Sequence, residues 1–141
     1  MTLLSRPPLP KSLSVDIWTA PFWEAAQRYE LVVCRCVVCG RRRMPPSPFC
    51  PNCQSQTILW DVLPGTGRVY SYTIVYQPAI AANAAPVPYA PAVIALDGAP
   101  GIRCISAIVD CDETRLVIDM PVRVVWQALA DGHLTAFFTP I

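Results

Sequence analysis

Residues 22–29, FWEAAQRY, carry an apolar side chain at each position expected for one face of a helix: Phe22, Trp23, Ala26 and Tyr29. Thr19 can cap the start of this helix, and Pro21 suits its first turn. The pattern predicts an amphipathic helix with an aromatic stripe. That stripe either packs into the core or docks onto a partner. Residues 31–36 then predict a short strand.

The second half of the chain is rich in β-formers. Val122, Val124 and Trp126 alternate with the residues between them, which is typical of a half-buried strand. Gly, Pro and Asp separate the five predicted strands, which cover residues 68–77, 91–97, 102–110, 122–129 and 134–140. This number of short strands predicts a small closed barrel, and the five-stranded OB-fold is the natural candidate.

Two segments lack a clear period. Residues 1–14 are a Pro-rich tail that either wraps a surface or stays loose. Residues 78–91 form a long, apolar and Pro-rich loop between the first two predicted strands. An ordinary solvent-facing loop is more polar, so this one either folds over its own barrel or contacts another protein.

Composition narrows the class of protein. The chain has 141 residues, of which 53% are hydrophobic, enough for the core of one domain. A net charge of +1 gives no overall field that would attract nucleic acid or anionic lipid. No apolar run has the length of a signal peptide or a membrane span. We therefore expect a reducing cytoplasm, where paired cysteines bind metal more often than they form disulfides.

Four cysteines form two C-x-x-C pairs separated by ten residues: Cys36, Cys39, Cys50 and Cys53. Two such knuckles place four sulfurs in a tetrahedron suited to zinc, and a redox pair would need only one of them. Gly40 follows the first knuckle, where positive φ helps the chain turn, and Gln54 fits the matching place less well. Four ligands close the site, so the predicted zinc is structural. The spacing alone leaves iron open.

The other cysteines are not assigned to the metal. Cys34 shares a strand face with Cys36 but lacks knuckle spacing, and Cys104 and Cys111 are typical of small core residues. Arginines crowd the same segment. They either compensate the −2 charge of a Zn(Cys)₄ centre or hold a phosphate group.

The sequence argues against an active site. It has one histidine, His133, beside Gly132 at a predicted hairpin turn, and one lysine, Lys11, in the tail. It contains no nucleophile elbow, P-loop, dinucleotide-binding or H-E-x-x-H motif. Asp110 and Asp112 are spaced like paired carboxylates, yet their setting is typical of a turn that binds its own backbone. These features favour a binding or accessory role.

A series of short motifs resembles a known family. They run in order from FWEAA through C-x-x-C-G-R (36–41), PPSPFCPNC (45–53), GTGRVYSYT (65–73), PYAP (88–91), LDGAP (96–100) and VDCD (109–112) to MPVRV (120–124). Together they resemble the zinc-ribbon plus OB-fold proteins that accompany thiolases and other acyl-CoA-processing enzymes. Asp119 and Gln54 depart from this pattern at positions where the family usually has Gly.

The resemblance implies a mainly β fold. An N-terminal tail and helix (1–30) would precede a rubredoxin-like zinc ribbon (31–60) and a five-stranded OB-fold barrel (61–141). It also implies a noncatalytic subunit of a hetero-oligomer that pairs with a thiolase-like enzyme and helps hold or pass acyl-CoA. A hydratase-like partner is the alternative.

Two further readings are weaker. Tyr70, Tyr72 and Tyr76 could stack bases in a single-stranded nucleic-acid-binding module. However, residues 65–141 carry four arginines against six acidic residues, a balance that would not attract phosphates. The reading as a free-standing enzyme is weak because the chain lacks a set of catalytic groups. We therefore expect neither nucleic acid nor membrane among the partners.

Candidate contact residues follow from this role. Guanidinium groups suit the phosphates of CoA, and the candidates are Arg41, Arg42, Arg43 and Arg68. Apolar and Pro-rich surface predicts the partner interface, at Phe22, Trp23, Pro86, Pro88, Tyr89 and Pro91.

Overall fold

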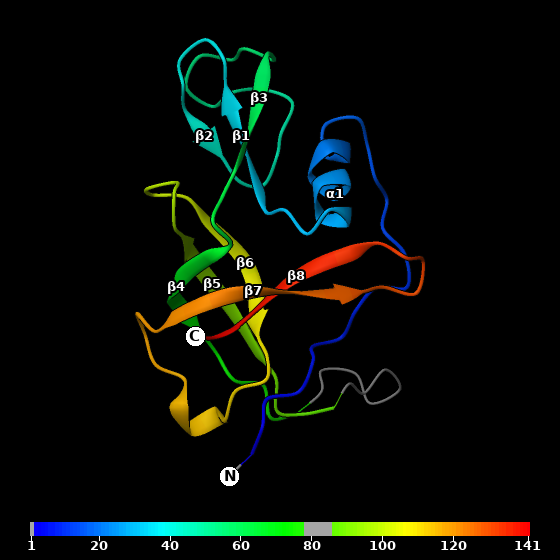
Figure 1. Ribbon diagram of the computed structural model, residues 1–141, viewed down its shortest axis with the longest axis vertical. Coiled ribbons are helices and arrows are strands. Elements are labelled where there is room, and N and C mark those ends of the chain that lie inside the picture. Colours follow the sequence, from blue (N-terminus) through cyan, green and yellow to red (C-terminus); the bar gives the residue numbers. More distant parts are fainter. Residues whose placement is uncertain (1, 78–85) are drawn as a thin grey trace.

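The cysteine segment and the β-rich half form two separate sheets in the computed structural model, which describes residues 2–77 and 86–141. The smaller sheet is the ribbon, with strand order β2–β1–β3 and antiparallel pairing. Its strands are β1 (Val32–Cys36), β2 (Arg42–Arg43) and β3 (Ile58–Val62). The ribbon lies at one end of the molecule, above the barrel in Figure 1.

The larger sheet is a closed barrel with strand order β4–β5–β6–β8–β7. Its strands are β4 (Thr66–Tyr72), β5 (Ala90–Leu96), β6 (Arg103–Ile108), β7 (Pro121–Ala128) and β8 (Leu134–Pro140). β6 and β8 pair in parallel, and a short 3₁₀ helix, η2 (Glu113–Arg115), lies between β6 and β7. This is the predicted five-stranded OB-fold, and the predicted mainly β class is confirmed.

The predicted first barrel strand, 68–77, is wrong at its C-terminal end. β4 stops at Tyr72, and its register shifts between Val69 and Ser71 at a β-bulge. Beyond β4, Val75 keeps one isolated bridge to Tyr89. Pairing with β5 resumes after the bulge, and Thr73 N–H still donates to Pro91 O (3.1 Å), so the β-rich sequence continues beyond the last regular pair at Tyr72.

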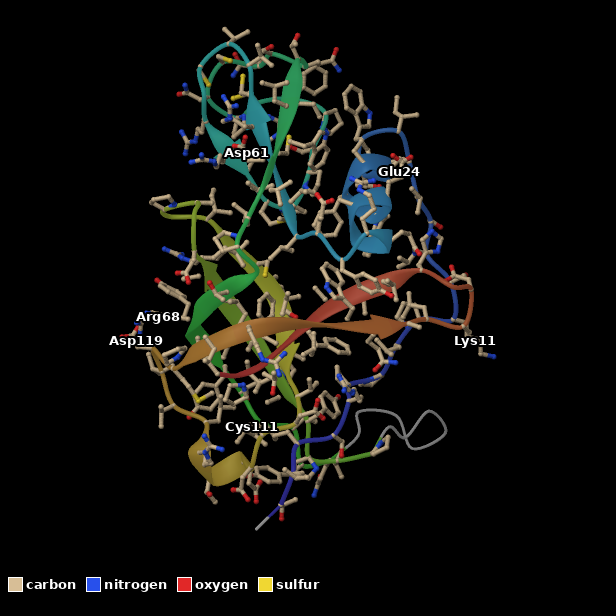
Figure 2. The ribbon with its side chains drawn as sticks, in the orientation of Figure 1. Lys11, Glu24, Asp61, Arg68, Cys111 and Asp119 are labelled. Carbon is tan, nitrogen blue, oxygen red and sulfur yellow. The ribbon has the colours of Figure 1, made fainter. Side chains whose placement is uncertain are left out.

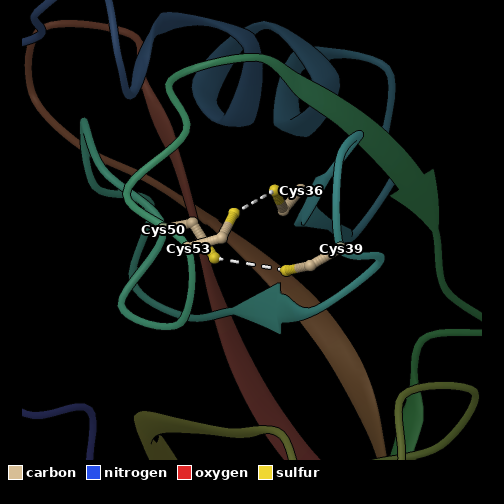
Figure 3. A group of neighbouring side chains, drawn as sticks. All are labelled: Cys36, Cys39, Cys50 and Cys53. Carbon is tan, nitrogen blue, oxygen red and sulfur yellow. Dashed lines mark hydrogen bonds between the residues drawn. The ribbon is translucent and has the colours of Figure 1, made fainter.

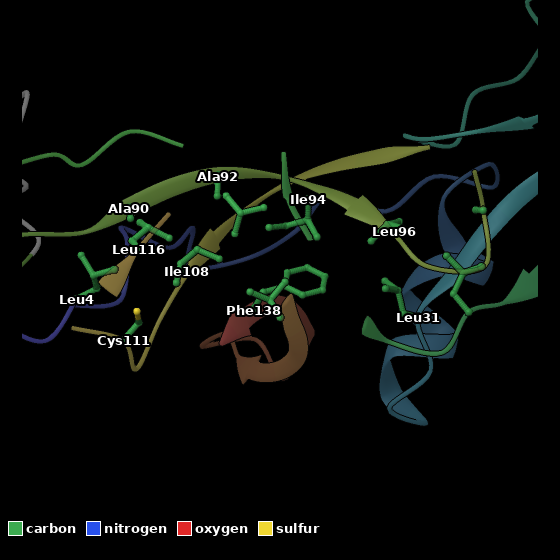
Figure 4. Packing of buried hydrophobic residues seen from close by; sticks show 14 of the residues in the cluster. Leu4, Leu31, Ala90, Ala92, Ile94, Leu96, Ile108, Cys111, Leu116 and Phe138 are labelled. Carbon is green, nitrogen blue, oxygen red and sulfur yellow. The ribbon is translucent and has the colours of Figure 1, made fainter. Parts of the chain in front are cut away.

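The core fills the barrel and continues to the base of the ribbon. Alternate residues of β5 point inward, and Phe138 of β8 and Ile108 of β6 meet them (Figure 4). Leu31 and Val33 from the ribbon side belong to the same buried cluster. The ribbon is therefore anchored on the barrel by shared apolar packing, in addition to the chain connections.

Helix α1 (Ala20–Gln27) lies beside the ribbon and packs on β8 and β1 (Figure 1). Thr19 occupies the N-cap position, but its side chain does not cap the helix. Asp16 organises this turn instead, because its Oδ1 accepts hydrogen bonds from the backbone N–H groups of Trp18 (2.9 Å) and Thr19 (2.8 Å). The helix ends two residues before Tyr29, where the predicted pattern ends; Tyr29 has φ +60° and is 68% exposed, so it is not part of the apolar stripe.

The Pro-rich N-terminal tail wraps the barrel. We call residues 2–13 the N-terminal strap. Within it, Leu4 donates its backbone N–H to Cys111 O (2.8 Å), and Ser5 donates to Pro88 O (2.7 Å). The Leu4 side chain is 4% exposed and joins the barrel core. Of the two alternatives for the tail, a wrapped surface is therefore correct.

Within residues 2–77 and 86–141, no helix is long and apolar enough to cross a membrane.

Candidate metal centre and neighbouring surfaces

The metal centre is built from two matching turns. In the first, Cys36 N–H donates to Arg41 O (2.8 Å) and Gly40 N–H donates to Cys36 O (2.9 Å). In the second, Cys50 N–H donates to Ser55 O and Gln54 N–H to Cys50 O, both at 2.9 Å. The same pair of bonds therefore shapes both knuckles, with Gly40 and Gln54 at equivalent positions.

The four knuckle sulfurs converge on one point (Figure 3). The Sγ atoms of Cys36 and Cys53 are 3.6 Å apart, those of Cys39 and Cys50 are 3.5 Å apart, and all four lie within 4.8 Å of one another. A tetrahedron with Zn–S bonds of about 2.3 Å has sulfur–sulfur edges of about 3.8 Å. A disulfide would need about 2.0 Å. The spacing thus fits four ligands around one metal ion and does not fit a disulfide.

The pKa values of these thiols move in opposite directions. The backbone N–H of Arg41 lowers the pKa of Cys39 to about 6, and the N–H of Cys39 lowers that of Cys36. The N–H of Ser55 also lowers the pKa of Cys53, but burial and the neighbouring thiols outweigh it and raise that pKa to about 11. Sulfurs this close together cannot all be ionised cheaply unless a cation lies between them.

The three remaining cysteines lie outside the four-sulfur cluster. Cys34 is fully buried, and burial raises its pKa against the opposing charge of Arg43. Burial also raises the pKa of Cys104 to about 12, and Cys111 is buried at the barrel end. All three behave as apolar core residues.

The ribbon arginines do not form one cluster that is free to bind a phosphate group. Arg42 shares the carboxylate of Asp61 with Arg35, at 3.0 Å and 2.9 Å. Arg43 is 6% exposed and donates twice to Ser47 O, through Nε at 3.2 Å and Nη2 at 2.8 Å. Arg41 alone of the predicted ribbon trio is exposed. The shared carboxylate at Asp61 gave no signal in the sequence, because it lies 19 residues from Arg42.

Arg68 does not join the ribbon arginines. It lies on β4 of the barrel, away from the ribbon, beside Asp119 (Figure 2). Its Nη1 donates to Asp119 O at 3.0 Å, and its side chain stays exposed. The structure therefore does not bring the four predicted CoA-contacting arginines together, and Arg41 and Arg68 are the two of them that are exposed residues.

The predicted interface residues fall into two groups. Phe22 and Trp23 lie on α1, half-buried, with their rings edge-to-face at 5.0 Å. Pro86 is exposed, Pro88 and Tyr89 are half-buried, and Pro91 belongs to β5 rather than to the predicted loop. Residues 78–85 of that loop lie outside the described residues. In Figure 1, α1 lies beside the ribbon in the upper part of the molecule, whereas the chain enters β5 near the bottom of the barrel.

The carboxylates and the histidine that the sequence singled out each have a partner within this chain. Asp112 accepts a hydrogen bond from Thr114 N–H (2.8 Å), as predicted for a turn. Asp110 pairs with Arg6 at 3.0 Å. His133 Nδ1 lies 2.8 Å from Asp131 Oδ2 at the β7–β8 hairpin turn. Sequence reasoning placed His133 at that turn but missed its pairing with Asp131.

Comparison with known proteins follows the same two parts of the chain. The model for the rubredoxin-like zinc ribbon domain of ChsH2 matches residues 23–58, and that for the ChsH2 C-terminal OB-fold domain matches residues 60–127. The first match identifies the metal of the four-cysteine centre as structural zinc.

Two curated relatives are informative. A probable enoyl-CoA hydratase alpha subunit from Thermomonospora curvata is 38% identical over 117 residues, or 81% of this chain. This chain spans about a third of that subunit, 34% of its length. A DUF35 domain-containing scaffold protein from Methanocaldococcus jannaschii is 33% identical over 114 residues, 77% of this chain and 79% of the relative.

A solved structure resembles most of the chain. It is described as the Ltp2-ChsH2(DUF35) aldolase, and the matching chain is 30% identical with a TM-score of 0.79. The match covers 92% of this chain and 98% of that one.

Proposed function

Because this chain belongs to the DUF35 family, with the zinc ribbon and OB-fold of ChsH2, we propose that it is a noncatalytic accessory subunit of an acyl-CoA-processing enzyme. Its partner would be a thiolase-like enzyme, which it stabilises and whose acyl-CoA it helps bind. The work would take place in the cytoplasm. The observation that carries this proposal is the match to nearly the whole DUF35 chain of the Ltp2-ChsH2 aldolase.

The metal centre supports an accessory role. All four positions of a tetrahedral ion are taken by Cys36, Cys39, Cys50 and Cys53, so none is left for a substrate or an activated water. Zinc bound here would hold the two knuckles together and would not take part in chemistry. The catalytic groups then belong to the partner.

A hydratase-like partner is the second candidate. It is favoured by the relative from Thermomonospora curvata, whose name is that of a hydratase alpha subunit. Because this chain spans only 34% of that protein, the hydratase activity can reside in the part that this chain does not match.

The nucleic-acid alternative loses support from the barrel surface. Tyr72 is half-buried and its hydroxyl donates to Leu116 O (3.1 Å), so it does not offer a free ring beside Tyr70. The Tyr70 ring is already covered by the Arg103 guanidinium, 3.9 Å from its centroid. A row of three stacking tyrosines is therefore not formed.

Co-expression tests the partner. We expect the protein and a thiolase-like enzyme encoded beside it to elute together in size-exclusion chromatography, and Tyr89→Ala to weaken that complex without changing the zinc content. A hydratase-like protein serves as the parallel partner. A monomer that ignores both proteins, and whose absence leaves their activities unchanged, would refute the accessory role.

Acyl-CoA contact is tested separately. Arg41 and Arg68 are the exposed candidates, so Arg41→Ala and Arg68→Ala should each weaken acyl-CoA binding by the assembled complex. Arg42→Ala is the matched control, because that guanidinium is engaged by Asp61. Isothermal titration of acyl-CoA into each complex measures the affinities, and equal values would remove these arginines from the site.

A further inference from the structure

A pocket of about 410 Å³ opens between α1, the segment that leads into it, and the β7–β8 hairpin turn. Val15 and Ala20 supply apolar lining, and Trp23 supplies an aromatic wall. The polar lining includes Glu24, Asp131 and His133. None of these side chains belongs to the metal centre, so the pocket is a separate feature of the molecule.

The aromatic wall is held in place from both sides. The Trp23 ring packs edge-to-face on Phe22 at 5.0 Å, and Phe22 packs against the barrel core. On its other side Trp23 meets the His133 ring, at 6.4 Å between centroids and 74° between planes. Such bracing presents a fixed aromatic surface, so little side-chain entropy is lost when a ligand binds to it.

The Asp131 carboxylate in the pocket is already bound by groups of this chain. Its Oδ1 accepts from His133 N–H (3.0 Å), and its Oδ2 accepts from Leu13 N–H (3.0 Å) of the strap and faces His133 Nδ1 at 2.8 Å. The backbone N–H of His133 is the main cause that lowers the pKa of Asp131 to about 2, so this carboxylate is ionised. An ionised carboxylate only accepts hydrogen bonds, and Nδ1 must therefore carry the proton. In the neutral imidazole this leaves Nε2 as a hydrogen-bond acceptor.

Glu24 is the second acceptor. It is exposed, and it makes no ion pair with any of the described residues. No lysine or arginine of the described chain lines the pocket. The pocket thus combines the aromatic face of Trp23, the Glu24 carboxylate and the His133 imidazole, and the carboxylates of Glu24 and Asp131 give it negative charge. That chemistry complements a cation with several hydrogen-bond donors.

We propose that this pocket receives an arginine side chain of the partner protein. A planar guanidinium stacks on tryptophan and carries five N–H donors, so one group can serve both Glu24 and His133 while it contacts Trp23. An ammonium group is a compact point charge and matches this spread of acceptors less well. The pocket chemistry stands on these residues alone, whereas the source of the arginine rests on the proposed accessory function.

The first experiment uses the isolated protein and N-acetylarginine amide as the probe. His133 is the only histidine in the sequence, so its imidazole proton resonances report on the pocket without ambiguity. We expect saturable shifts of these resonances with the arginine probe, and at least about tenfold weaker binding of the neutral isostere N-acetylcitrulline amide. Equal binding of the two probes, or no shift with either, would overturn the inference.

Variants separate a specific contact from a general charge effect. Glu24→Gln should weaken binding of the arginine probe by about fivefold or more. Asp119→Asn removes one negative charge from an exposed side chain on the other side of the molecule (Figure 2) and should change binding by less than about twofold. Equal losses in the two variants would show that only net charge matters and would overturn the pocket assignment.

The last arm tests the source of the arginine. In the complex with the thiolase-like partner, Glu24→Gln should raise the dissociation constant by about fivefold or more, and Asp119→Asn should leave it unchanged. If the probe binds as expected but Glu24→Gln does not weaken the complex, the partner does not supply the arginine and the inference fails, while the accessory role stands. If wild-type protein binds the probe but no partner, the accessory role itself fails.

Discussion

The two knuckles allow a direct test of how backbone conformation controls metal binding. Gly40 and Gln54 occupy equivalent places, donate the same 2.9 Å hydrogen bond, and have φ of +77° and +61°. A non-glycine residue in this left-handed region costs about 1–2 kcal/mol, and Gly removes that cost. Gly also has more conformational freedom in the unfolded chain, and this offsets about 0.5–1 kcal/mol of the stabilisation. Gln54→Gly should therefore stabilise the ribbon by about 0.5–1 kcal/mol.

The reverse change at the equivalent position provides the matched comparison. A Cβ added at Gly40 would meet nothing within 4 Å, so Gly40→Ala has no steric cost from its neighbours. Its effect is purely conformational, and we expect a loss of about 1 kcal/mol. The Gln54 side chain is exposed and forms no hydrogen bond with the described residues, so its removal should cost little.

Zinc affinity is the appropriate measure, because the free energy of folding a small metal-bound ribbon is part of its metal-binding free energy. Competition of zinc against a chromophoric chelator should show about two- to fivefold tighter binding for Gln54→Gly and about fivefold weaker binding for Gly40→Ala. Weaker binding by Gln54→Gly, or unchanged binding by Gly40→Ala, would show that φ at these positions does not limit the stability of the centre.

Three further outcomes are expected. Leu4→Ala should destabilise the barrel by about 2–4 kcal/mol in urea unfolding, because the side chain is 4% exposed, whereas Leu3→Ala, at 66% exposed, should stay within about 0.5 kcal/mol; similar losses would show that the strap does not anchor the fold. Cys50→Ser should abolish zinc binding in elemental analysis and Cys34→Ser should retain one equivalent; zinc lost from the second variant would add it to the ligands. Asp131→Asn should lower stability near pH 6, and the difference from wild type should shrink as the pH falls below about 4 and vanish only well below pH 2, because a carboxyl whose pKa drops from 3.8 to about 2 on folding contributes only while it is ionised. A difference that does not shrink between pH 4 and pH 2 would contradict that assignment.

Features fixed by local chemistry were predicted well from the sequence. The C-x-x-C pairs lie in turns closed by hydrogen bonds to residues within five positions, so spacing alone located the four sulfurs. The last strand, Leu134–Pro140, was predicted to the residue, because Gly132 marks the turn and a run rich in β-forming residues, LTAFFTP, follows it. In both cases the pattern that identifies the element also stabilises it.

Features that depend on distant residues were not predictable in the same way. Leu4 is buried because it contacts Cys111. A Pro-rich tail has no hydrophobic periodicity from which such a contact could be predicted. Arg42 gave the same local signal as exposed Arg41, and only its distant partner, Asp61, distinguishes the two. The arginines predicted to contact phosphate therefore have different surroundings in the fold.

The N-terminal strap has a consequence for the order in which this chain folds during synthesis. The strap is synthesised before the groups it binds, because Cys111 O and the Asp131 carboxylate lie more than a hundred residues further along the chain. The zinc ligands span only residues 36–53, so the ribbon can capture its metal while the rest of the barrel is still being translated. The apolar side chain of Leu4 stays exposed to water until the barrel has formed. The strap is thus made before its partners but is among the last segments to fold, and until then it is exposed to chaperones and proteases.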